Sequence, residues 1–124
     1  MNDVLNTFIE NIKTKAPGFI AVSVTEIESG VAYDSYTADE NFDPNLASAY
    51  NLEVVKAKLK AIEALGLKEE IEDITITLKG QIHIINIAPS KAYFIYLAVD
   101  SSQANMGITK ALLNKYKKEL NEAI

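Results

Sequence analysis

Apolar positions along this chain fall into segments with two different periods. Residues 2–15 place apolar side chains at every third or fourth position, which predicts an amphipathic helix ended by Pro17 and Gly18. The segments 19–27 and 31–36 are rich in β-branched and aromatic residues, so they are typical of strands. A short polar turn with a glycine separates them, as in a β-hairpin.

The longest predicted helix runs from Asp43 to Gly66. Asp43 suits the N-cap, Pro44 the first helical position, and Gly66 the left-handed residue that ends a helix. This helix has two apolar stripes, named here after one member of each. The Tyr50 stripe is Leu46, Ala47, Tyr50, Val54, Ala57, Ala61, Ala64 and Leu65. The Leu52 stripe is Leu52, Val55, Leu59 and Ile62. A surface helix usually buries one stripe, so two stripes predict two packing partners.

Three further strands and a closing helix follow. Residues 74–78 alternate apolar and polar side chains, which predicts a strand with one buried face. Residues 81–88 form the next strand, and 92–99 are continuously apolar, as in a central strand covered on both faces. Apolar positions at helical spacing in 108–120 predict the last helix.

The order of these elements predicts the fold class. The connections within each group of strands are too short for parallel crossovers, so both groups are antiparallel. Strands that are apolar on both faces need helices on both faces. We therefore expect one α+β domain over residues 1–124, a three-layer α/β/α sandwich around a five-stranded antiparallel sheet.

Composition and charge exclude some partners. The chain has 124 residues, 48% of them hydrophobic, and a formal net charge of −5. This acidic balance disfavours nucleic acid. No apolar run is long enough to predict insertion into a membrane, and the acidic start does not resemble a signal peptide, so we expect a cytoplasmic protein. The chain has no cysteine and no arginine.

The sequence offers no constellation of catalytic, cofactor-binding or metal-ligating residues. Its five glycines are isolated, so no phosphate-binding loop is expected. His83 is the only histidine, and a strand histidine that either faces solvent or has satisfied hydrogen bonds is the favoured interpretation. The acidic segment 68–73 lacks the glycine and ligand spacing of a calcium loop. We therefore expect no cofactor, no metal and no enzymatic activity.

The second apolar stripe of the long helix predicts an interface, because large apolar patches on soluble domains mark partner surfaces. Cover by the first helix or a loop of the same chain is the alternative. The strand at 74–78 follows a crossover, so we expect it at a sheet edge, where strands pair with partners unless they are blunted. The hypothetical dimer or partner interface is Leu52, Val55, Leu59, Ile62, Ile74, Thr75, Ile76 and Thr77.

Several segments resemble the roadblock family, which is named for a dynein light chain and includes bacterial partners of Ras-like GTPases. The resemblance is carried by the strand–turn–strand segment 85–97, the Asn105-Met106-Gly107-Ile108 opening of the last helix, the first strand at 18–22, and the long helix. It implies a sheet order of 2-1-5-4-3, with the long helix on one face and both terminal helices on the other. It also implies homo- or heterodimers built from the long helix and the third strand. On that picture the Tyr50 stripe packs on the sheet and the Leu52 stripe faces the second subunit.

The resemblance implies a function as a non-enzymatic dimeric scaffold or regulator of a small Ras-like GTPase. A structural adaptor in a motor or cytoskeletal assembly, without nucleotide dependence, is one alternative, and a small-molecule sensor is another. Position 110, often arginine in relatives, is Lys110 here. Without any arginine, activation of a GTPase could not use an arginine finger and would reposition the partner's own groups.

Overall fold

The computed structural model describes residues 2–124 of the chain. In chain order the helices and strands are α1 (Asn2–Lys15), β1 (Phe19–Glu26), β2 (Ala32–Thr37), α2 (Pro44–Ala64), β3 (Asp73–Thr77), β4 (Gln81–Ile87), β5 (Tyr93–Asp100) and α3 (Met106–Ala123). The predicted order of helices and strands is confirmed, and the bounds differ by at most three residues.

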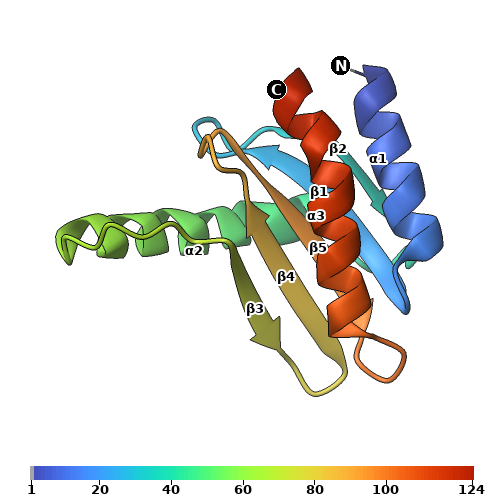
Figure 1. Cartoon of the computed structure of the whole chain (residues 1–124). Coiled ribbons are helices and arrows are strands. Elements are labelled where there is room, and N and C mark those ends of the chain that lie inside the picture. Colours follow the sequence, from blue (N-terminus) through green and yellow to red (C-terminus); the bar gives the residue numbers. More distant parts are fainter. Residues whose placement is uncertain (1) are drawn as a thin grey trace.

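The five strands form one antiparallel sheet in the order β2-β1-β5-β4-β3. This confirms the order that the family resemblance implied. Helices α1 and α3 lie side by side on one face and α2 crosses the other, so the molecule has three layers (Figure 1). Two hydrophobic cores result, one under α1 and α3 and one under α2. The α+β sandwich expected from the apolar pattern is confirmed.

Strand β5 lies at the centre of the sheet, between β1 and β4. All side chains from Tyr93 to Val99 are buried. Its odd-numbered residues up to Val99 pack in the core under α1 and α3, and its even-numbered residues up to Ala98 pack in the core under α2. The continuous apolar run therefore arises because helices cover both faces of this strand.

Helix α2 begins and ends where the sequence predicts. The Asp43 carboxylate accepts hydrogen bonds from the backbone N–H groups of Asn45, at 3.0 Å, and Leu46, at 3.1 Å. At the other end Gly66 has a φ of +66°, and its N–H donates to the carbonyl of Glu63 at 3.0 Å. These two caps satisfy backbone groups that a helix leaves unpaired at its ends.

The prediction of which α2 stripe packs on the sheet is wrong. Leu52 is 7% exposed and Val55 is 0% exposed, and both lie in the core under α2. Tyr50 is 72% exposed and Leu46 is 56% exposed. The Leu52 stripe therefore faces this chain's own sheet, and the Tyr50 stripe faces outward.

The side chains of β1 give the physical reason for this rotation. Its α2 face carries the small, fully buried residues Ala21, Ser23 and Thr25. Small side chains on the sheet leave room for larger ones on the helix, since cores pack to near-constant density. The hydroxyls of Ser23 and Ser48 also hydrogen-bond to each other across this contact. The bulky stripe therefore packs inward and the alanine-rich stripe stays outside.

Candidate interaction surface

The outward side of α2 is an apolar surface. The Tyr50 stripe, apart from Ala47, lies outside the core under α2, although Val54 and Ala61 are half-buried. Tyr50 and Leu65 are 72% and 70% exposed, and the members between them are mostly alanine. Small side chains allow a second backbone to approach closely, and an apolar patch on the surface of a soluble domain marks an interface. This surface is the first part of the candidate site.

Strand β3 provides the second part, an open sheet edge. Its ladder with β4 includes the bonds from Leu78 N–H to the Gln81 carbonyl, at 2.8 Å, and from Ile87 N–H to the Glu72 carbonyl, at 3.2 Å. In an antiparallel pair, alternate residues bond to the neighbouring strand, so the backbone groups of the even-numbered residues of β3 are bonded to β4. The backbone groups of Asp73, Thr75 and Thr77 therefore face the free edge. Such an edge is a template for pairing with another strand.

The opposite edge of the sheet, at β2, is partly blocked. Ala38 N–H donates to the Ile20 carbonyl at 2.8 Å, so the even-numbered residues of β2 near Thr37 bond to β1. The backbone of Ser35 thus faces outward, but its N–H donates to the Asp34 carboxylate at 2.8 Å. Side-chain capping and an edge charge are common ways to prevent pairing. The two edges differ, and β3 is the one open to a partner.

The predicted interface residues are distributed over three environments. Leu52 and Val55 are core residues, which removes them from any surface. Leu59, Ile62, Ile74 and Ile76 are half-buried, and Leu59 and Ile74 touch the core under α2. Thr75 and Thr77 are exposed on the free edge. The apolar pattern of α2 did not identify the Tyr50 stripe as the outward one, and the small residues of β1 were the signal that could have identified it.

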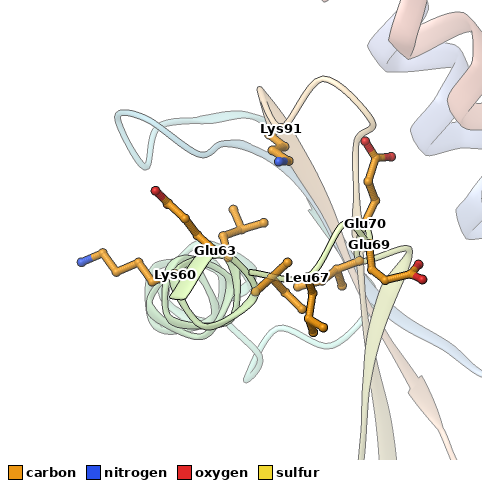
Figure 2. Close-up of a pocket in the computed structure, with 9 residues that line it drawn as sticks. Lys60, Glu63, Leu67, Glu69, Glu70 and Lys91 are labelled. Atoms are coloured by element: carbon orange, nitrogen blue, oxygen red, sulfur yellow. The ribbon is translucent and has the colours of Figure 1, made fainter. Parts of the chain in front are cut away.

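A hollow of about 400 Å³ lies at the C-terminal half of α2 (Figure 2). Helix α2, the segment that leads to β3 and the turn between β4 and β5 enclose it. Lys60 and Glu63 come from the helix, Leu67, Glu69 and Glu70 from the connecting segment, and Lys91 from the turn; Leu59, Ile62 and Ile71 complete the lining.

His83 has hydrogen-bond partners on both ring nitrogens. Its Nε2 lies 2.8 Å from Oε1 of Gln81, and its Nδ1 lies 3.2 Å from the Tyr96 hydroxyl. Its ring lies nearly perpendicular to that of Phe42, with an interplanar angle of 89°. Burial lowers the pKa of His83, and burial raises the pKa of the Tyr96 hydroxyl. A neutral imidazole with satisfied partners fits a structural histidine, as the sequence predicted.

Within residues 2–124, no cluster of three or more histidine, aspartate or glutamate side chains is arranged to hold a metal ion. Among the helices of the described chain, none has the length and apolarity to cross a membrane.

No family model and no curated protein sequence matches this chain. Solved structures do match it over almost its whole length. MglB from Myxococcus xanthus is 15% identical with a TM-score of 0.83, over 98% of this chain and 87% of that one. A Roadblock/LC7 domain from Streptomyces avermitilis is 8% identical with a TM-score of 0.81, over 94% of each chain. A structure described as MglB with a tetrameric arrangement is 11% identical with a TM-score of 0.80, over 98% of this chain and 87% of that one. At such low identity the likeness establishes the fold, which is roadblock-like.

Proposed function

We propose that this chain, whose fold is roadblock-like, forms a dimer that serves as a non-enzymatic scaffold or regulator of a small Ras-like GTPase. The observation that carries the proposal is the pairing of two unfilled surfaces, the outward Tyr50 stripe and the open edge of β3. Both favour a protein partner over a small substrate. The tetrameric arrangement described for an MglB structure of the same fold supports self-association.

The backbone geometry of β3 suggests how two copies meet. With a two-fold axis beside this edge, the β3 residues whose backbone groups face outward pair with the same set of residues in the second copy. If Asp73, Thr75 and Thr77 all pair with the second copy, Thr75 lies opposite Thr75 of that copy and Asp73 lies opposite its Thr77. A register centred on Asp73 would instead oppose two like charges, which destabilises a strand pair. The proposed dimer therefore has a ten-stranded sheet centred on Thr75.

The alanines of α2 suit the same dimer. Two sheets joined at β3 carry both α2 helices on one face, and the C-terminal half of α2 extends past the sheet in Figure 1. An antiparallel pair of these helices would bury Tyr50 of each copy against small side chains near Ala57 and Ala61 of the other. Helices with small residues at the contact approach closely and lose little side-chain entropy.

The regulator acts through position rather than through a catalytic group. With no arginine in the chain, it has no residue to stabilise transition-state charge in the way of an arginine finger. A dimeric surface that binds one conformation of the GTPase more tightly shifts the GTPase toward that conformation. This mechanism predicts binding that depends on the nucleotide.

A pull-down from lysate of the cell of origin tests the proposal. Tagged protein is incubated in excess GDP and, separately, in a non-hydrolysable GTP analogue. Enrichment of a Ras-like GTPase in one nucleotide state supports regulation, and hydrolysis is then measured with and without the chain. The same partners in both states, with none that binds nucleotide, would contradict the GTPase proposal and favour a structural adaptor.

A further inference from the structure

None of the residues that line the hollow in Figure 2 belongs to the Tyr50 stripe or to β3. Leu59, Ile62 and Ile71 are apolar residues of its lining, and Leu67, also in the lining, is 49% exposed. A smaller adjoining hollow shares Ile71 and Lys91 and continues toward the turn between β4 and β5. We call the two together the loop groove. A partly exposed apolar lining with a charged rim is typical of a binding site for a protein segment.

One wall of the loop groove has a backbone without partners. Residues 68–71 form no regular element, and their N–H and C=O groups make no hydrogen bond with any other residue of the described chain. Hydrogen bonding resumes at Glu72, whose carbonyl accepts from Ile87. An extended peptide can pair with a backbone segment of this kind, as in strand addition.

The charges on this wall define the chemistry of the occupant. Glu69 and Glu70 are exposed, and neither forms an ion pair within residues 2–124. Glu70 and Glu72 also line a neighbouring hollow of about 350 Å³ on the α3 side of the same segment. The charged residues that line the hollow are three glutamates, Glu63, Glu69 and Glu70, and two lysines, Lys60 and Lys91. The connecting segment has Lys68 against Glu69, Glu70 and Glu72, so it is negative and attracts cations.

We propose that the loop groove binds an extended, basic and apolar segment of a partner protein. Apolar side chains of that segment contact Leu59, Ile62 and Ile71, and its arginine or lysine side chains face Glu69 and Glu70. The site is independent of the GTPase proposal, because neither the Tyr50 stripe nor the edge of β3 takes part. A dimer could therefore hold one additional partner on each subunit.

The test uses the full chain and a fluorescein-labelled peptide of sequence RRLLLRR, with EELLLEE as the matched peptide. Fluorescence anisotropy measures binding, and backbone amide chemical shifts map it. We expect saturable binding of the basic peptide alone, with shifts confined to residues 59–71 and 87–91. Glu69→Lys with Glu70→Lys should weaken binding of the basic peptide about tenfold or more, because two attractive charge contacts with the peptide become repulsive.

The control is Asp39→Lys with Glu40→Lys, which makes the same change of charge in the exposed loop before α2. It should bind the peptide as the wild type does. An equal loss in this control, or shifts spread over other acidic surfaces, would reduce the binding to non-specific charge attraction and overturn the proposal. A change in the mass of the Glu69→Lys, Glu70→Lys protein in solution would also overturn it, because a second copy would then occupy the groove.

Discussion

The hydroxyls of Ser23 on β1 and Ser48 on α2 are hydrogen-bonded to each other inside the core. Ser23 is 0% exposed and Ser48 is 2% exposed, so water cannot replace either partner. The bond joins β1 to the inward side of α2 and favours the rotation of α2 that the small side chains of β1 allow. With Ser48 inward, Leu52 and Val55 follow on the same side, and Tyr50 must face outward.

Removing one serine of this pair should cost more than removing both. Ser48→Ala leaves the buried Ser23 hydroxyl without its partner, which should lower the free energy of unfolding by about 1–3 kcal/mol. Ser23→Ala with Ser48→Ala removes both polar groups and should recover part of that loss. Urea unfolding of the two single variants and the double variant measures the difference. Losses that simply add would show that the two hydroxyls are not coupled.

Stability should depend on the protonation of His83. Burial lowers the pKa of His83 from its ordinary 6.5, so the unfolded chain binds the proton more readily than the folded one. The stability that neutral His83 contributes is fully present above pH 6.5. It is lost as the pH falls from 6.5 through the lower pKa that His83 has in the folded chain. Urea unfolding at steps from neutral pH downward should therefore show a loss of stability that His83→Gln does not share. Parallel pH profiles of the two proteins would contradict this assignment.

Much of the fold follows from local features of the sequence. Asp43 and Gly66 mark the ends of α2 because capping depends on the residues themselves. The apolar run of β5 marks the central strand because burial on both faces leaves no polar positions. The rotation of α2 about its own axis could not be predicted from local features of the sequence. Both of its stripes are apolar, and the choice between them depends on Ser23 and Thr25, which come from a strand far away in the sequence.

The open edge of β3 was predicted from the order of elements, but its register was not. Which backbone groups are free depends on the pairing of β3 with β4, and the alternation of apolar residues does not determine this pairing by itself. The loop groove could not be predicted from the sequence either. The sequence shows only that segment 68–73 is acidic and lacks the pattern of a calcium loop, and the fold places its residues beside Leu59 and Lys91.

Oxidation of single-cysteine variants should reveal the register of the proposed dimer. The chain has no cysteine, so Thr75→Cys introduces the only thiol. Opposite residues in this register have Cα atoms about 5.5 Å apart, which suits a disulfide. Two copies of Thr77→Cys would lie about 13 Å apart, too far to be joined. We expect a covalent dimer from Thr75→Cys and little from Thr77→Cys, as seen on a non-reducing gel.

The reverse result, with Thr77→Cys linked and Thr75→Cys not, would place the two-fold axis elsewhere along β3. Equal and slow linkage of both variants would indicate random collision and contradict a dimer joined at this edge.

The most direct test of the account is the mass in solution of the wild type and of Tyr50→Glu, measured by light scattering, with circular dichroism as the measure of folding. Tyr50 is exposed and is proposed to be buried between two copies of α2, so a charge there should leave the chain folded and separate the dimer. Leu52→Glu is the matched change on the inward stripe and should unfold the chain. A dimeric wild type with a folded, monomeric Tyr50→Glu is the predicted result. A monomeric wild type, or a Tyr50→Glu protein that remains dimeric, would contradict the proposal that the outward face of α2 is the surface of self-association.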